Sequence, residues 1–325
     1  SGVIEILLVD PATGGSTFTP ARRGTYFFYS WSPDGELIAA LGPGPRGTSL
    51  DVLDRDGAVV STTPVDGGSV FIAWEPGGSD LLVHRDTDLL LIPGGRDTAS
   101  QVDLGRLGSD FQAPSWIPGT RQALVVSTDP SGPRLMRVDI DTLELDDLGA
   151  VGGMTAVSVH PSGDRAVIAH VGTPGDGSTV QTAFDGRPSP VQAAVAAVEI
   201  VDLVSGERRL ISDETAIWME WSPDGSRLLL ATLGPGSGRW RIWDGEELST
   251  IDDFTPSAVF LQSYILFSDQ YVETPRLWSP DGSAIVHGAT TDAGTGVVVH
   301  RSGTESPAAI IAADPIAFWS PVTPG

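Results

Sequence analysis

Short apolar runs separated by turn-forming residues recur along most of this chain. Four such runs occupy residues 37–40, 81–83, 123–126 and 228–231, and each of them follows a cluster rich in Pro, Gly or Asp. Apolar runs of this length, bounded by residues that favour turns, are typical of β-strands. The pattern therefore predicts an all-β protein built from many short strands.

One short phrase, Trp-Ser-Pro-Asp-Gly, precedes these runs and repeats along the chain. Complete copies begin at Trp31, Trp221 and Trp278, and weaker copies begin at Trp74, Trp116, Val159 and Trp319. The prolines of the seven copies are separated by 43, 42, 43, 62, 57 and 41 residues. Since a period near 42 residues is the length of one four-stranded blade, the repeat predicts a seven-bladed β-propeller.

The chemistry of the phrase explains its place in a blade. Proline fixes φ at the first corner of a turn, Asp suits the second, and Gly accepts the left-handed conformation that follows. We therefore interpret Asp34, Asp224 and Asp281 as turn residues and not as catalytic carboxylates. The tryptophans that precede the turns are interpreted as plugs between neighbouring blades: Trp31, Trp74, Trp116, Trp221, Trp278 and Trp319.

A second register of strands follows the first at a constant distance. Asp54, Asp139 and Asp244 each end an apolar segment, and each lies 23 residues after the tryptophan of its own repeat. This spacing defines a blade of four strands, A to D. The phrase connects strands A and B, the Asp ends strand C, and strand D is outermost.

The repeat predicts one domain over residues 1–325. Six blades are expected at approximately residues 26–67, 68–108, 109–150, 151–213, 214–254 and 255–314. The closing blade is expected to combine residues 315–325 with residues 1–20, because the C-terminal segment resembles a strand A and the N-terminal segment a strand C. Such pairing would close the ring and cover exposed sheet edges.

Two departures from the period predict where function resides. In the fourth blade Val159 and Asp202 are 43 residues apart instead of 23, which places an insertion within about 172–191, between strands B and C. The second insertion, 255–275, precedes the sixth blade. There Thr255 as N-cap and Pro256 at the first helical position predict a short helix.

Both insertions are expected on one face of the propeller, because B–C and D–A connections leave a blade at the same end. We predict that this face, with the mouth of the central channel, binds a protein or peptide partner. Aromatic anchors and polar contacts are typical of such surfaces. The candidate binding residues are Arg46, Phe184, Arg187, Tyr264, Asp269, Gln270, Tyr271 and Arg276. The alternative is that the insertions cap the channel or pack on the ring.

Charge and cysteine content exclude several classes of function. The chain has 42 acidic and 19 basic residues, all of the latter Arg, and a net charge of −23. Such an acidic chain disfavours nucleic-acid binding, because it repels phosphate. The absence of Cys excludes disulfides and thiol catalysis. No apolar stretch is long enough for a transmembrane helix, and an export signal or lipid anchor removed from the chain is plausible.

The search for local catalytic motifs yields little. The five histidines form no short metal-binding pair, there is no Gly-x-Ser-x-Gly elbow, and the absence of Lys excludes a phosphate-loop lysine. Each histidine is interpreted as solvated or hydrogen-bonded: His84, His160, His170, His287 and His300. No cofactor and no catalytic residue is predicted, although a metal site assembled from several blades stays open as an alternative.

The phrases at Trp31, Trp221 and Trp278, with the strands that follow them, resemble the WD40-like (PD40) repeat of the TolB-like propeller family. The resemblance implies an extracytoplasmic bacterial protein that serves as a binding or scaffold module. The leading hypothesis is therefore a non-enzymatic propeller that binds a protein or peptide. The alternatives are a metal-dependent lyase or hydrolase with its site in the channel, and a structural subunit of a cell-surface assembly.

Overall fold

The protein is described here by a computed structural model. It describes residues 26–45, 47–65, 70–96, 101–106, 113–152, 154–171, 196–234, 237–256, 276–291, 294–301, 309–312 and 319. Every strand pairing within them is antiparallel, and within each sheet the strands lie side by side in chain order.

Three four-stranded sheets form the first half of the chain. The first contains β1 (Phe28–Trp31), β2 (Leu37–Gly44), β3 (Gly47–Asp54) and β4 (Val59–Val65). The second contains β5 (Val70–Trp74), β6 (Leu81–Arg85), β7 (Asp88–Ile92) and β8 (Val102–Arg106), with a short 3₁₀ turn, η1 (Pro93–Gly95), after β7. The third contains β9 (Ser115–Ile117), β10 (Gln122–Asp129), β11 (Gly132–Asp139) and β12 (Leu145–Ala150).

The second half forms one more four-stranded sheet and one larger sheet. The fourth sheet contains β13 (Met154–Val159), β14 (Arg165–Val171), β15 (Ala196–Asp202) and β16 (Arg208–Ser212). The fifth has seven strands: β17 (Ala216–Trp221), β18 (Leu228–Gly234), β19 (Ser237–Trp243), β20 (Leu248–Pro256), β21 (Ala284–Thr291), β22 (Gly294–Arg301) and β23 (Ala309–Ala312).

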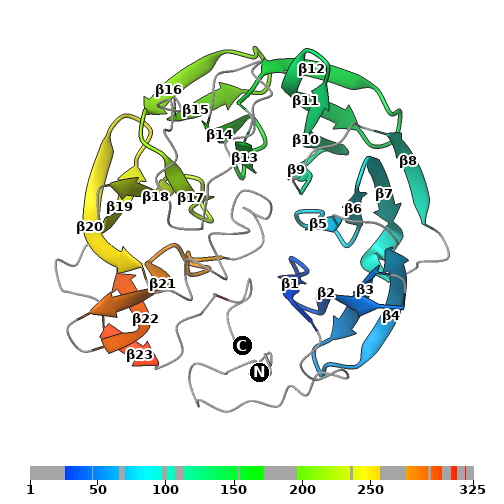
Figure 1. The fold of residues 1–325 in the computed structure, drawn as a ribbon, viewed down its shortest axis with the longest axis horizontal. Coiled ribbons are helices and arrows are strands. Elements are labelled where there is room, and N and C mark those ends of the chain that lie inside the picture. Colours follow the sequence, from blue (N-terminus) through cyan, green and yellow to red (C-terminus); the bar gives the residue numbers. More distant parts are fainter. Residues whose placement is uncertain are drawn as a thin grey trace, which may run out of the picture.

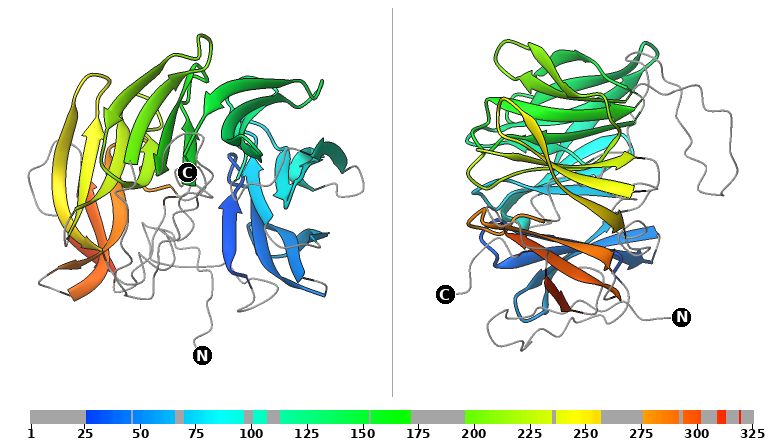
Figure 2. Two further views of the ribbon diagram at one scale, coloured as in Figure 1. Left: turned by 45° about the horizontal axis from the view of Figure 1, so that its top comes forward. Right: turned by 90° about the vertical axis from the view of Figure 1, so that its left-hand side faces the viewer.

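The sheets are arranged around a common centre in the manner of a β-propeller (Figure 1). The strands β1, β5, β9, β13 and β17 lie nearest the centre, and β4, β8, β12, β16 and β20 lie at the rim. The edge-on view in Figure 2 shows the sheets stacked one behind another, with their strands crossing the thickness of the disc. The described residues thus form an all-β propeller, as the short apolar runs predict.

The core lies in the seams between neighbouring sheets. Leu41 and Val52 of the first sheet pack with Ile72 and Leu81 of the second, and all four are almost fully buried. Equivalent apolar clusters join the second sheet to the third, the third to the fourth, and the fourth to the fifth. Because each strand presents alternate residues to its two faces, one sheet contributes to two seams.

The prediction of seven blades is wrong for this structure. The described residues form five sheets, because the outer strand β20 continues to Pro256 and pairs with β21 through Thr255–Thr290 and Pro256–Ala289. This pairing merges the units expected as the fifth and sixth blades into one seven-stranded sheet. Of the expected closing blade, residues 315–325 and 1–20, only Trp319 belongs to the described residues.

The prediction of a helix that begins at Thr255 is also wrong. Thr255 and Pro256 are the last residues of strand β20, and the described residues contain no α-helix. The N-cap and first-turn preferences are local, and here two ladder pairs with β21 take precedence over them. Residues 257–275, the rest of that insertion, lie outside the described residues.

Candidate functional site

The tryptophans of the repeated phrase connect each inner strand to the sheet before it. The indole Nε1–H of Trp74 donates to the carbonyl of Ser30 at 3.2 Å, and that of Trp116 donates to Ala73 at 3.1 Å. The same bond joins Trp221 to Ser158 at 3.3 Å and Trp278 to Glu220 at 3.3 Å. These four indoles are buried. Trp31 and Trp319, the first and last of the set, are half-buried.

The aspartates of the phrase organise the turns that follow. In the complete copies a serine hydroxyl donates to the aspartate two residues later at 2.6 Å, in the pairs Ser32–Asp34, Ser222–Asp224 and Ser279–Asp281. The serine hydroxyl bonds, followed by backbone N–H donation, lower the pKa of Asp224 and of Asp281 to about 2. The glycine that closes each turn has positive φ, 70° at Gly35 and 70° at Gly225. Their partners therefore assign these carboxylates a structural role.

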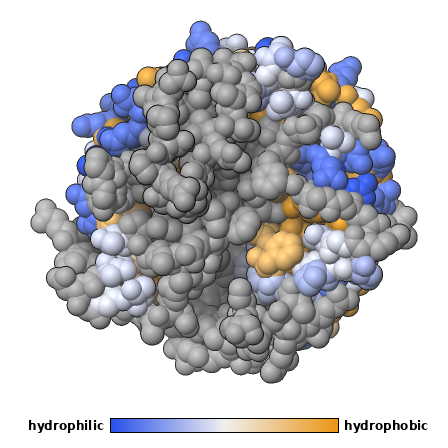
Figure 3. Space-filling model, viewed as in Figure 1, coloured by the Kyte–Doolittle hydropathy of each residue, from blue (hydrophilic) through white to orange (hydrophobic). Residues whose placement is uncertain are grey.

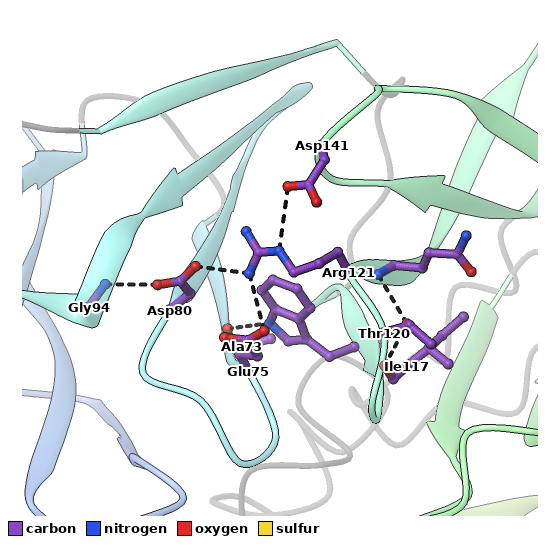
Figure 4. Close-up of polar contacts among 10 residues, drawn as sticks. Ala73, Glu75, Asp80, Gly94, Ile117, Thr120, Arg121 and Asp141 are labelled. Carbon is purple, nitrogen blue, oxygen red and sulfur yellow. Dashed lines mark hydrogen bonds and ion pairs between the residues drawn. The ribbon is translucent and has the colours of Figure 1, made fainter.

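A charged cluster spans the seam between the second and third sheets, on the side of the A–B turns. Arg121 donates through Nη1 to Glu75 at 3.1 Å and to Asp80 at 3.0 Å, and its Nε lies 3.5 Å from Asp141 (Figure 4). Its guanidinium also lies over the Trp116 ring, 5.6 Å from the centroid. The cluster links the second and third sheets through side chains of their turns, so we assign it a structural role.

Most of the predicted binding residues lie outside the described residues. These are Arg46, Phe184, Arg187, Tyr264, Asp269, Gln270 and Tyr271. Arg276 is described: its side chain is exposed, and its carbonyl accepts the backbone N–H of Trp319 at 2.9 Å. The structure therefore places one residue of the predicted set, next to the inner strand position of Leu277 and Trp278.

The B–C connections show which end of the propeller is elaborated. Five of them are tight hairpins whose flanking residues pair directly: Gly44–Gly47, Arg85–Asp88, Asp129–Gly132, Gly234–Ser237 and Thr291–Gly294. In the fourth sheet the flanking pair is Val171–Ala196, so residues 172–195 leave and return at one point. This connection departs from the same end of its sheet as the five short hairpins.

The described surface at that end carries both ionic and apolar groups. Glu214, just before β17, pairs with Arg241 at 3.0 Å and with Arg239 at 3.4 Å, and Arg239 also pairs with Asp253 at 3.2 Å. On the first sheet Phe27 is 55% exposed, immediately before β1. The space-filling view shows an apolar patch over the start of β1, beside the centre of the ring (Figure 3).

Sequence reasoning missed a buried acid on β17, the inner edge strand of the fifth sheet. Glu220, on β17, accepts the backbone N–H of Leu277 at 2.8 Å and, less closely, those of Trp278 and the Trp218 indole at 3.4 Å. Burial raises the pKa of the Glu220 carboxyl to about 7, against the lowering effects of these donors and of Arg276. In the other sheets the same position holds Ser30, Ala73, Ser115 or Ser158. That substitution was the available signal.

The histidines are less solvated than the sequence suggests. His84, His160, His170 and His287 are buried. His160 joins two sheets through Nε2 and the carbonyl of Gly225, 2.8 Å apart, with its ring edge-on to Trp221. His84, His170 and His287 lie on strands β6, β14 and β21, whereas His160 lies in the turn after β13.

Two histidines make direct contact between adjacent strands. His287 of β21 and His300 of β22 face each other through their Nε2 atoms at 3.0 Å, and the His300 Nε2 lies 3.4 Å from Asp252 of β20. Burial, with the neighbouring His300, lowers the pKa of His287 to about 3. Burial also lowers the pKa of His300, and Asp252 partly offsets this. Within the described ranges, no group of three His, Asp or Glu side chains is arranged to hold a metal ion.

In the part of the chain that the structure describes, no helix is long and apolar enough to cross a membrane.

Comparisons with known proteins give the fold. No family model matches the chain, and no curated protein matches it. Three similar solved structures are TolB from Acinetobacter baumannii (14% identity, TM-score 0.52), the Cps50 (Swd1) β-propeller domain of Myceliophteria thermophila (13%, 0.59) and the hydrazine synthase of Kuenenia stuttgartiensis (17%, 0.57). These matches cover 86%, 93% and 91% of this chain. They cover 60%, 92% and 88% of the three matched chains, so this chain spans less than two thirds of the TolB structure. At such identities the likeness shows the fold alone, a β-propeller.

Proposed function

We propose that this TolB-like propeller is a non-enzymatic binding module that holds a protein or peptide partner on the face bearing the 172–191 and 255–275 segments. The observation that carries the proposal is the contrast between the B–C connections. Five are closed by two-residue loops, whereas Val171 and Ala196 are paired ends from which the long connection departs. Long loops on a rigid scaffold are where binding residues concentrate.

The composition of the inserted segment supports a polar contact surface with a few anchors. Phe184 and Arg187 lie in the 172–191 segment, and aromatic and arginine side chains are enriched at protein interfaces. Tyr264, Asp269, Gln270 and Tyr271 of the second segment complete the proposed contact set, with Arg276 beside it and Arg46 on the B–C loop of the first sheet. An acidic chain of net charge −23 favours a partner with basic groups.

The test uses a peptide library as the probe, because the partner is unidentified. Peptides selected on the full chain are measured by calorimetry against wild type and against a chain lacking 174–189. A matched control, Arg55→Ala, removes an exposed charge at the opposite end of the first sheet. We expect the deletion to weaken binding at least tenfold while the control leaves it unchanged. Unchanged affinity in the deletion variant would exclude this loop as the binding site.

The proposal extends to location outside the cytoplasm, as the resemblance to the TolB-like repeat implies. The test is fractionation of cells that express the full-length gene product, with protease added to intact cells. Protection from protease together with cytoplasmic recovery would overturn this part and leave the binding proposal standing.

A further inference from the structure

The junction between β17–β20 and the strands β21–β22 combines a buried apolar centre with ionisable groups at both of its ends. Its apolar centre is formed by Trp218, Trp240 and Phe254 on one side and by Trp278 and Ile285 on the other. Glu220 is buried at the inner end and His287 at the outer end, where the partly buried His300 faces it. We call this junction the β20–β21 seam.

The geometry of the outer end allows only one proton between the two rings. When two Nε2 atoms face each other at 3.0 Å, one must donate and the other accept. His300 is placed to be the donor, because its Nε2 also lies 3.4 Å from the Asp252 carboxylate. A proton added to the Nε2 of His287 would set one N–H against another. The pair can therefore close only while His287 is neutral.

The groups around the pair offer His287 little compensation for a charge. Trp240 of β19 and Phe254 of β20 pack against the His287 ring, with centroids 5.0 and 5.3 Å away. Among the described residues, the titratable groups in contact with the pair are the two rings themselves and Asp252. Asp252 contacts His300, so the first proton is expected on His300, and the second, on His287, opens the contact.

The inner end has the opposite chemistry. The Glu220 carboxyl accepts the backbone N–H groups of Leu277 and Trp278, next to the isolated bridge Trp278–Ile285. Arg276 is the charged residue that acts on Glu220, and Trp218 of the same strand contributes its indole N–H. Because Glu220 is buried, loss of its proton places a negative charge in a low-dielectric site.

We propose that the β20–β21 seam is a proton-controlled hinge whose two ends respond to pH in opposite directions. Acid frees the outer end, where His287 and His300 meet, and tightens the inner end around Glu220. Neutral to alkaline pH reverses both. The hinge adds a regulatory property to the fold and does not depend on the proposed binding function.

The sign and size of each response follow from proton linkage. His287 has a depressed pKa. Its contribution to holding the outer end closed is therefore fully present above its ordinary pKa of about 6.5 and is lost as pH falls. One proton taken up on opening raises the opening equilibrium of the outer end about tenfold between pH 7.5 and 5.5. Glu220 has a raised pKa, so its contribution is present in acid and is lost as pH rises through about 7. When pH falls from 7.5 to 5.5, the opening equilibrium constant of the inner end therefore decreases about twentyfold.

The test is hydrogen exchange followed by mass spectrometry at pH 7.5 and 5.5, corrected for intrinsic exchange rates. Peptides from β20 and β21 report the outer end, and peptides covering β17 and residues 277–279 report the inner end. Strands β10 and β11 serve as the internal reference, because they lie across the ring from the seam (Figure 1). We expect opposite trends at the two ends. Parallel trends, or no trend beyond that of the reference, would overturn the hinge.

Two variants separate the ends. Glu220→Gln is expected to abolish the inner trend and keep the outer one, and His287→Gln to do the reverse. If His287→Gln does not fold, the imidazole proton resonances of the wild-type protein decide the outer end. His287 that stays neutral at pH 5 supports the proposal, and a midpoint between pH 6 and 7 overturns it.

Discussion

The tryptophan connections between sheets predict a large and position-dependent effect on stability. Trp116 is 1% exposed, lies in the apolar cluster between the second and third sheets, and bonds to Ala73. Substitution to Ala removes the ring from this packed seam. Replacing a buried large aromatic side chain with Ala lowers the free energy of unfolding by about 3–5 kcal/mol in comparable cores. The expected loss is a large share of the total stability of a folded protein, which is about 5–15 kcal/mol.

Two further variants divide this loss into its parts. Trp116→Phe keeps most of the apolar packing and removes the bond to the Ala73 carbonyl, so a loss of about 0.5–1.5 kcal/mol is expected from the bond alone. Trp31→Ala is the matched control, because Trp31 occupies the same place in the first copy but is only half-buried. A smaller loss is expected there than at Trp116.

The assay is reversible urea unfolding followed by far-ultraviolet circular dichroism, with the midpoint and the slope fitted for each variant. A loss of less than about 1 kcal/mol for Trp116→Ala would refute the reasoning, since it would mean that the seams do not depend on the indoles. An equal loss at Trp31 and Trp116 would refute the claim that burial in a seam sets the magnitude.

Three other outcomes are expected. Glu220→Gln removes a contribution to stability that is present in acid and lost as pH rises through about 7. In urea unfolding, the free energy of unfolding of the variant should therefore gain on that of wild type by an amount on the order of 2 kcal/mol from pH 5 to pH 8; a constant difference would contradict this. In thermal melts, Gly225→Ala should lower stability more than Gly206→Ala. Both glycines have positive φ, but of the two only a Cβ at position 225 would meet a side chain, the His160 ring. Equal losses would mean that φ alone sets the cost of the substitution. Asp224→Asn should destabilise the protein at pH 5 and lose that effect near pH 2. The depressed pKa of Asp224 makes its contribution to stability present above pH 3.8 or so, and that contribution is lost as pH falls through about 2. A loss of stability that persists at pH 2 would argue against the Ser222 and Ser226 bonds as its cause.

The repeat in the sequence determined the local units of this protein. Pro, Asp and Gly at fixed places specify a turn without help from the rest of the chain, because φ restriction and side-chain capping act over a few residues. The apolar runs after each turn specify strands for the same reason. Hence the all-β class and the turns at Asp224 and Asp281 follow from local chemistry, and the propeller architecture follows from the period of the repeat.

Only the tertiary structure decided how these units join. Thr255 and Pro256 carry the local signals of a helix start, yet they end strand β20, because pairing with β21 is a contact between segments far apart in the chain. The number of sheets changed with that pairing. The chemistry of the β20–β21 seam was decided in the same way. The sequence marks Glu220 only as a departure from the Ser or Ala of the other repeats. It does not give the raised or lowered pKa, which arises from burial and from neighbours that folding brings into contact.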